Sequence, residues 1–486
     1  MKRIITMVLV LCMAFALIAC GAAAGENAGG EGGNGGGVFK AGFGMRDITP
    51  KDSVPLDSYG DARDRMSTGL YSKLEARAVA VQDENGGLLI FAVGDVSWCP
   101  NALGNVIRDD MSGELGIPKE YIILSGTHTH ASVATGLTDI SSVSKFNERY
   151  IKGMEDAIRD AVKDLKPTKV YVGSVEAPGM NFVRRYIMDD GSLTGDNAYG
   201  TGSVITHHET DADPEVQLMK FVREGGKDIL ISQFQAHPHL ETKTNNVSAQ
   251  TVGAIRDAVE EQLGAHSLHW QGAAGNLNSN SRIPEEQIYT KEDRVKYGKD
   301  MVSKYISKVY NDLTEVKTGP VKVQEVTFSG KTNHVYNHMV NEAQMVVDYF
   351  NSGHTAGETA TYAHQLSAEK NLDMRINSYY HANRILGNSR KGAVTELALA
   401  AWSFGEVGGV VNAYEMFDVT GMYIKEHSPF VRTFIVGYSY PGGGGYIPTI
   451  EGFKNGGYEA DNCMFAPGSA EEIADNLLNM LEDMHG

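Results

Sequence analysis

The sequence predicts an α/β fold: a single large mixed α/β domain over residues 38–486, with a mostly parallel core sheet. Short Val- and Ile-rich runs bounded by Gly, Asp or Asn have the length and composition of buried strands. Segments with apolar residues at helical spacing alternate with several of these runs, an order typical of parallel sheets. In open sheets of this kind, sites lie at the carboxyl ends of the strands, where we expect this protein's site.

The predicted elements follow one another without a second linker or an internal repeat, so we expect one domain after residue 37. The predicted strands cover residues 76–82, 88–94, 121–125, 169–174, 216–222, 228–235, 321–328 and 432–437. The predicted helices cover residues 146–165, 248–263 and 291–313, with a fourth at the C-terminus. Start signals are Ser248, Thr290 with Asp293, and the capping box formed by Ser469 and Glu472.

The N-terminus has the pattern of a bacterial export signal. Lys2 and Arg3 precede an apolar run from Ile4 to Ile18, which is too short for a comfortable membrane span. The run ends in Leu-Ile-Ala-Cys-Gly, which resembles a lipobox in which Cys20 is acylated and becomes the first residue of the mature protein. The alternative is an ordinary signal peptide that contains a cysteine. We expect residues 1–20 to be a lipoprotein signal peptide.

Residues 21–37 hold almost nothing but Gly, Ala, Asn and Glu. Such a segment has no apolar surface to bury, which predicts a flexible tether. Together with lipidation of Cys20, this composition predicts an exported lipoprotein, anchored in the cell membrane and facing outside the cytoplasm.

The composition of the chain limits the classes of partner that the protein can bind and the disulfides that it can form. The net charge of −18 argues against nucleic acid, because binding to phosphates needs a basic surface. Of the four cysteines, Cys12 leaves with the signal and Cys20 is used for lipid. The remaining Cys99 and Cys463 are too few for a disulfide-built scaffold, and the sequence leaves open whether they pair or stay as buried thiols.

Two His-x-His pairs each follow a predicted strand. His128 and His130 follow the run 121–125, and His237 and His239 follow the run 228–235. In extended backbone, residues two apart point to the same face, so both imidazoles of a pair can face one site. One such pair arises easily by chance, whereas two at strand ends favour a metal site. Zinc fits best, because no pair of thiolates is available; the alternative is that one pair is structural.

A third segment, residues 270–280, is rich in small residues and then in Asn. Small residues allow close approach of a backbone to a ligand, and amide groups can stabilise an oxyanion. Alone, this pattern is equally that of an ordinary loop.

In this order, the segments resemble the N-terminal catalytic domain of the neutral/alkaline (non-lysosomal) ceramidase family. The likeness covers nearly all of residues 40–460. Ser-Gly-Thr-His-Thr-His at 125–130 is similar to the family's Ala-Thr-His-Thr-His-Ser motif, and Gln-Ala-His-Pro at 235–238 to its second His segment. Further similar segments are residues 41–50, 74–78, 93–95, 271–280, 413–415 and 445–449.

The resemblance implies a Zn²⁺ ion and four ligands: His128, His237, Glu415 and Tyr446. His130 is then a catalytic residue beside the ligands, facing the substrate. Spacing alone nominates the four histidines of the two pairs instead, so we keep His239 as a reserve ligand. Glu415 and Tyr446 rest on the resemblance alone.

The chain departs from the family at the nucleophile. The family's nucleophilic Ser aligns with Asn278, and the Asp two positions before it with Asn276. Ser279 is one residue away, and a one-residue shift re-aims a side chain. Zinc lowers the pKa of bound water toward about 7, which makes attack on a carbonyl possible without a side-chain nucleophile. We therefore expect His130 to carry a proton to the leaving amine while Asn276 and Asn278 orient the acyl group.

Arg184 and Arg185 are adjacent donors that we predict to bind an anionic or polyol part of the substrate; the alternative is a solvated basic pair. These residues together predict a zinc-dependent amidohydrolase that cleaves an N-acyl bond of a lipid-like or related substrate. Two alternatives remain open. One is a catalytically silent, solute-binding surface lipoprotein on the same fold, and the other is a His-x-His zinc hydrolase acting on a phosphoester or a cyclic amide.

Overall fold

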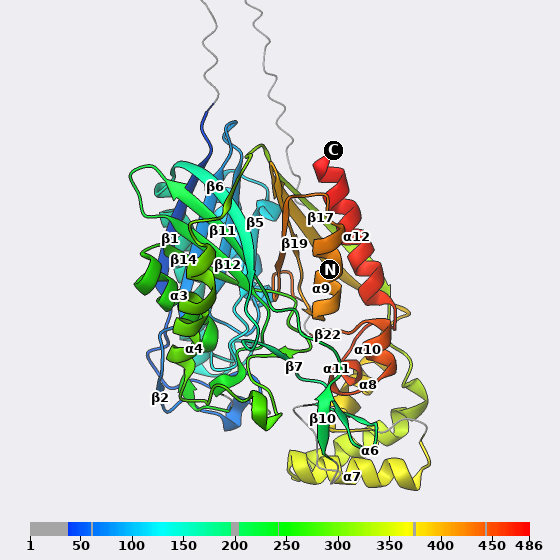
Figure 1. Ribbon diagram of the computed structural model, residues 1–486. Coiled ribbons are helices and arrows are strands. Elements are labelled where there is room, and N and C mark those ends of the chain that lie inside the picture. Colours follow the sequence, from blue (N-terminus) through cyan, green and yellow to red (C-terminus); the bar gives the residue numbers. More distant parts are fainter. Residues whose placement is uncertain (1–36, 60–61, 196–203, 242, 373–375, 443–444) are drawn as a thin grey trace, which may run out of the picture. The chain divides into compact units, whose positions relative to one another are not determined.

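The larger of two main β-sheets carries most of the strands that the sequence predicts (Figure 1). The computed structural model describes residues 37–59, 62–195, 204–241, 243–372, 376–442 and 445–486. Residues Gly37–Gly486 form one compact unit. The predicted signal peptide, Cys20 and residues 21–36 of the predicted tether lie outside the described residues.

The large sheet has the strand order β14-β12-β11-β6-β1-β3-β4-β5, and β16 pairs with β6. Its strands are β1 (Lys40–Asp47), β3 (Glu75–Gln82), β4 (Leu88–Gly94), β5 (Ile122–Gly126), β6 (Lys166–Glu176), β11 (Glu215–Arg223), β12 (Ile229–Phe234), β14 (His266–Gln271) and β16 (Thr314–Val316). The eight predicted strands all correspond to observed ones; six lie in this sheet and two in the second.

This sheet is mixed, so the expectation of a mostly parallel core is not met. In it, β4 pairs with β5 and β12 with β14 in parallel, and the other pairs are antiparallel. The strands read as continuous apolar runs because both faces of the sheet are covered, and such burial does not require parallel neighbours. A tight turn joins β3 to β4, where Oδ1 of Asp83 accepts hydrogen bonds from the backbone N–H groups of Asn85 and Gly87, both at 2.8 Å.

The second main sheet has the order β17-β18-β19-β21. Its strands are β17 (Val321–Lys331), β18 (Val394–Phe404), β19 (Val407–Val411) and β21 (Arg432–Val436). It faces the large sheet across an apolar core to which both contribute. The ring of Phe91 lies 5.0 Å from that of Trp270 and 4.8 Å from that of Trp402, which ties the two sheets together.

Helices cover the outer faces of both sheets (Figure 1). The large sheet packs against α1 (Asn101–Leu115), α2 (Ser141–Lys163), α3 (Gln250–Leu263) and α4 (Arg294–Asp300). The second sheet packs against α9 (Asp418–His427) and α12 (Ser469–His485), while α6 (Val340–Asn351), α7 (Ala356–Glu369) and α8 (Tyr379–Ser389) pack on one another beyond the end of this sheet (Figure 1). The architecture is therefore four layers, helix–sheet–sheet–helix.

Short strands and helices join these layers near the site. They include β7 (Phe182–Val183), β15 (Leu277–Asn278), β20 (Glu415–Met416), β22 (Tyr446–Ile447), α10 (Ile450–Lys454) and α11 (Tyr458–Asp461). Further short strands are β2 (Gly69–Leu70), β8 (Tyr186–Met188), β9 (Leu193–Thr194), β10 (Ile205–His208) and β13 (Asn246–Val247). The stretch predicted as one helix at 291–313 is α4, a π-helical segment (Met301–Ile306) and α5 (Ser307–Val309).

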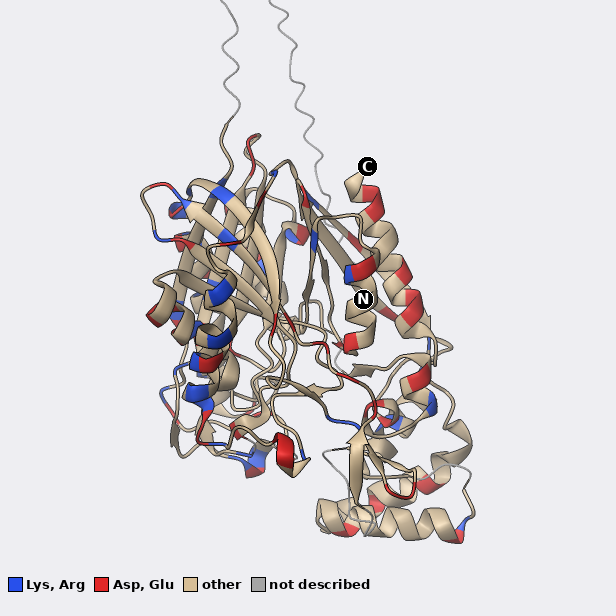
Figure 2. Ribbon diagram, in the orientation of Figure 1, with Lys and Arg blue, Asp and Glu red and all other residues tan. Residues whose placement is uncertain are grey.

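Two of the predicted helix-capping residues can be compared with the observed helix starts. The Ser248 hydroxyl accepts a hydrogen bond from the backbone N–H of Gln250 at 3.0 Å, but α3 begins at Gln250 with Ala249 at its N-cap and no side-chain cap, so Ser248 is not the capping residue that the sequence predicts. The capping box at Ser469 and Glu472 is wrong: α12 is capped by Gly468, with no side-chain cap hydrogen bond. The apolar side of α12 packs on the second sheet, while Glu472, Asp475, Glu482 and Asp483 are exposed on its outer side (Figure 2).

Among the described residues, none of the helices combines the length and the apolar character that crossing a membrane requires. Cys99 and Cys463 are both buried and unpaired, which answers the question that the sequence left open about them.

Candidate metal centre

The four side chains predicted as metal ligands come together from four separate segments. His128 follows the end of β5 by two residues, and His237 follows the end of β12 by three. Glu415 and Tyr446 lie opposite each other in the parallel pair β20–β22. All four are buried, with at most 7 % of any of these residues exposed. The structure therefore places the residues implied by the family resemblance at one site.

The carboxylate of Glu415 lies among the other three groups. Its Oε2 atom is 2.8 Å from Nε2 of His237 and 3.7 Å from Nε2 of His128. The Tyr446 hydroxyl also hydrogen-bonds to this carboxylate. Burial raises the pKa of Glu415, while the neighbouring His128 and Arg184 act to lower it.

Backbone carbonyl groups determine which nitrogen of each imidazole carries the hydrogen. Nδ1 of His128 is 2.9 Å from the carbonyl oxygen of Ser97. Nδ1 of His237 is 2.8 Å from that of Ala274 and 3.0 Å from that of Leu277. A carbonyl oxygen can only accept, so both Nδ1 atoms donate and both Nε2 atoms present a lone pair to the centre.

The residues fit a metal ion. Among the described residues, the buried Nε2 of His237 and Oε2 of Glu415 have no hydrogen-bond donor, although they lie 2.8 Å apart. Two lone pairs at this distance repel each other unless a cation lies between them. Burial, and then His237, lower the pKa of His128 to about 3, and burial also holds the pKa of His237 well below its usual value. Neutral imidazoles with a carboxylate and a phenol form a donor set of the kind that zinc accepts.

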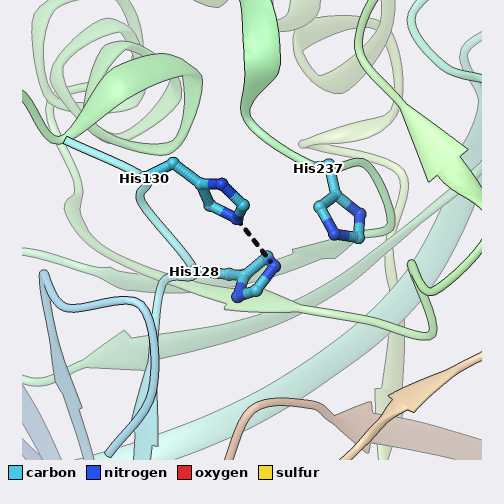
Figure 3. Close-up of side chains that lie close together, drawn as sticks. All are labelled: His128, His130 and His237. Carbon is cyan, nitrogen blue, oxygen red and sulfur yellow. Dashed lines mark hydrogen bonds between the residues drawn. The ribbon is translucent and has the colours of Figure 1, made fainter. Parts of the chain in front are cut away.

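His130 and His239 continue the cluster on one side. Nε2 of His130 is 3.0 Å from Nε2 of His128 (Figure 3), and Nε2 of His239 is 3.1 Å from Nδ1 of His130. Because Nε2 of His128 carries a lone pair, His130 donates to it and in turn accepts from His239. Ligand atoms of His128, His130 and His237 lie within 4.8 Å of one another, which makes His130 the nearest competitor to Glu415 as a ligand.

The sequence model described as the N-terminal part of the neutral/alkaline non-lysosomal ceramidases matches residues 39–381. The chain belongs to this ceramidase family. No curated protein sequence matches the chain.

Solved structures have the same fold as this ceramidase-family protein. One is the neutral ceramidase from Pseudomonas aeruginosa, with a TM-score of 0.67 and 15% identity, over 92% of this chain and 74% of that one. A second, a ceramidase complexed with C2, has a TM-score of 0.66 and 16% identity, over 92% of this chain and 75% of that one.

The two asparagines that replace family residues are placed differently from each other. Nδ2 of Asn276 donates to Oδ1 of Asp418 at 2.7 Å, and Oδ1 of Asn276 accepts from the Asp418 backbone N–H at 2.9 Å. Its amide is thus used within the protein, and burial raises the pKa of Asp418 to about 6. Asn278 hydrogen-bonds to His239 and forms a parallel bridge with His237, so Asn278 is the one that borders the centre.

Ser279 is buried and is not positioned to act as a nucleophile. Its hydroxyl donates to the backbone carbonyl oxygen of His237 at 3.0 Å. A serine nucleophile needs a base positioned to accept its proton. The bond to a carbonyl instead holds the segment that carries His237.

Arg184 and Arg185 belong to a buried ion-pair network. Nε of Arg184 is 2.9 Å from Glu459, and its guanidinium lies 5.2 Å from the ring centre of Tyr446. Arg185 donates to Glu209 and Glu459 and to two backbone carbonyl oxygens. Arg185 is fully buried, and this arrangement indicates that it stabilises the protein around the site rather than contacting a substrate.

Sequence reasoning missed the aromatic wall of the centre. The ring of Tyr438 stacks on His128, with centroids 3.8 Å apart and an interplanar angle of 23°. The Trp98 ring lies nearly perpendicular to the same imidazole, with ring centroids 5.3 Å apart. His128 and Tyr438 both have positive φ, at 61° and 54°, an uncommon conformation that tends to occur at functional sites. No motif in the sequence marks either aromatic residue.

Proposed function

We propose that this protein is a zinc-dependent hydrolase that cleaves an N-acyl amide bond of a lipid-like substrate. The single observation that carries the proposal is the pair of lone pairs at Nε2 of His237 and Oε2 of Glu415, buried 2.8 Å apart beside His128. Membership of the ceramidase family supports amide hydrolysis, because ceramidases hydrolyse the amide bond of ceramide.

His128, His237, Glu415 and Tyr446 would hold the ion. When bound, zinc supplies a Lewis acid and makes hydroxide available near neutral pH. The backbone carbonyls of Ser97, Ala274 and Leu277 keep both imidazoles oriented toward the centre. These supporting contacts are what a preorganised site requires.

His130 is positioned to move a proton. Its Nε2–H donates to the lone pair of His128, which a metal ion would take up, so with the ion held this N–H would be available to the substrate. Its Nδ1 accepts from His239, so the ring can release one proton and recover another from the opposite nitrogen. An amide leaving group needs a proton before the C–N bond can break, and we assign that transfer to Nε2 of His130. Asn278, bonded to His239, lies where it can orient the acyl group.

The proposal is tested by measuring metal content and amide turnover on the same preparations. The purified chain should hold about one equivalent of zinc and hydrolyse an N-acyl amide. His128→Ala, His237→Ala and Glu415→Gln should lose both properties, and the exposed His207→Ala serves as the matched control. Loss of zinc in His239→Ala together with its retention in Glu415→Gln would reject the assigned ligands. Zinc binding without turnover on amides or esters would favour the silent solute-binding lipoprotein.

We also propose that the protein is exported and carried on the membrane by a lipid at Cys20. The Leu-Ile-Ala-Cys-Gly run and the Gly-rich segment behind it support this. Cells fed a radioactive fatty acid should label the wild-type protein but not Cys20→Ala. Equal labelling of the two proteins would exclude lipidation at this residue.

A further inference from the structure

Arg384 differs from the other arginines that surround the centre. It lies on α8, is half-buried, and makes no hydrogen bond or ion pair with any described residue. Arg184 and Arg185, in contrast, share the carboxylate of Glu459. Burial lowers the pKa of Arg384, against the opposing effects of Cys463 and Tyr458. A partly desolvated guanidinium with five N–H donors is costly to leave without an acceptor.

Its position is next to the strand that carries Tyr446. Gly445 precedes Tyr446, and its carbonyl oxygen accepts a hydrogen bond from the backbone N–H of Glu415 at 3.1 Å. A Cβ atom at Gly445 would lie 3.6 Å from Nη2 of Arg384 and 3.2 Å from the carbonyl oxygen of Asn462. With φ at 102°, Gly445 adopts a conformation that other residues rarely take, so no side chain projects from this position toward the guanidinium.

Tyr458 joins Arg384 to the centre. It lies on α11, which contacts both β22 and α8 (Figure 1). Its ring centre is 5.5 Å from that of Tyr446, at an interplanar angle of 66°. Tyr458 interacts electrostatically with Glu415 and with Arg384. It is half-buried, and its hydroxyl has no hydrogen-bond partner among the described residues.

We infer that Arg384 and Tyr458 bind an acidic group, a carboxylate or a sulfonate, on the substrate whose amide bond lies at the metal centre. This inference rests on the proposed amide hydrolysis and narrows its substrate class to anionic N-acyl compounds. A neutral amide would leave the guanidinium without a counter-ion, whereas an oxyanion accepts from both donors at once. The role that the sequence assigned to Arg184 and Arg185 thus passes to Arg384.

The test compares three amides that share one acyl chain. N-dodecanoylglycine carries a carboxylate, N-dodecanoyltaurine a sulfonate, and N-dodecanoylethanolamine no charge. The full-length zinc-loaded protein should prefer the anionic amides, and the order of the first two identifies the oxyanion. Arg384→Met should lower kcat/KM for the preferred anionic amide by about 10–100-fold and leave that for the ethanolamide nearly unchanged. Tyr458→Phe should have a smaller effect of the same kind, and Arg384→Lys should restore part of the preference.

A second measurement, of the melting temperature, distinguishes substrate binding by Arg384 from a structural role. Removing a half-buried charge that has no hydrogen-bond partner among the described residues should leave the melting temperature of Arg384→Met unchanged or higher, whereas loss of a structural contact would lower it. The matched control is Arg390→Met, which removes an exposed arginine next to the end of the same helix.

The outcomes separate the inference from the function on which it rests. Equal hydrolysis of charged and neutral amides by the wild type and Arg384→Met would overturn the inference and leave the hydrolase intact. If no amide is cleaved, the hydrolase fails, and calorimetric binding of the three compounds decides on Arg384 alone. Binding of the anionic amides that is no weaker in Arg384→Met than in the wild type would then reject the acidic-group site.

Discussion

Nε2 of His237 faces Oε2 of Glu415 at 2.8 Å, while Nδ1 of the same ring is occupied by two backbone carbonyl groups. The ring therefore has no hydrogen to offer the carboxylate. Only a shared proton or a metal ion can relieve the repulsion between these two atoms. The proton and the metal ion compete for the same position. A metal ion that binds here displaces a proton, which links occupancy of the centre to pH.

His130→Ala should keep the zinc and lose most of the turnover. The ring holds a proton at Nε2 directed at the centre, and removal of a positioned acid or base typically lowers a rate by about 10²–10⁴-fold. Metal analysis and steady-state kinetics on one preparation give both values. If zinc leaves together with activity, His130 is a ligand, and the three-histidine group replaces the set that includes Glu415.

Ser279→Ala should retain activity within several-fold. Its hydroxyl donates to the carbonyl oxygen of His237, so it is not available as a nucleophile. The lost bond should appear mainly as a decrease in stability of about 1 kcal/mol. Mass spectrometry of the enzyme mixed rapidly with an activated ester gives an independent measurement. An acyl group trapped on Ser279 would restore serine chemistry one position beyond Asn278.

Arg185→Met should destabilise the fold by about 3–5 kcal/mol, because it removes the arginine paired with Glu209 and one of the two arginines that share the buried carboxylate of Glu459. Urea denaturation measures this loss, with Arg390→Met as the exposed control. A variant of normal stability with a raised KM would instead support the substrate contact predicted from the sequence.

His269→Gln should reduce the loss of stability on acidification. Burial, and then Arg256, lower the pKa of His269 from 6.5 to about 3. The unfolded chain therefore binds a proton below pH 6.5 that the folded protein rejects, and stability is lost as the pH falls from 6.5 toward 3. Each pH unit in that window costs about 1.4 kcal/mol.

The comparison for His269 uses the change in unfolding free energy between pH 7.5 and 5.5, measured for both proteins. The change should be about 1.4 kcal/mol smaller in His269→Gln. The buried histidines of the centre contribute equally to both proteins and cancel. An identical pH dependence in the two proteins would show that the buried His269 is protonated as readily as a solvent-exposed one.

Local sequence signals predicted the positions of the strands well, but they predicted the relative directions of neighbouring strands poorly. The runs around β3 and β4 are identifiable from their apolar residues, but their antiparallel pairing depends on the tight turn at Asp83. A strand that is covered on both faces has the same apolar content whether it runs parallel or antiparallel to its neighbours. The aromatic contact between Phe91 and Trp402, which ties the second sheet to the first, is likewise not visible in the sequence of either strand alone.

Within the site, the histidines were predictable and their partners were not. His128 and His237 follow strands, so their spacing marks them. Glu415 and Tyr446 lie in two-residue strands that no periodicity reveals, and only the family resemblance nominated them. Asp418, which holds Asn276, is 142 residues away in the chain, so a role for Asn276 inferred from alignment overlooked the group that occupies its amide.

The pairing of β20 with β22 also decides when the centre comes into existence. The two imidazoles belong to segments that follow strands of the large sheet, whereas Glu415 lies between the last two strands of the second sheet and Tyr446 follows its last strand. A chain interrupted before Glu415 would offer a metal ion two nitrogen ligands and no more of this set. Metal content in a population of molecules would therefore count the chains that have completed assembly, and not merely those that have been synthesised.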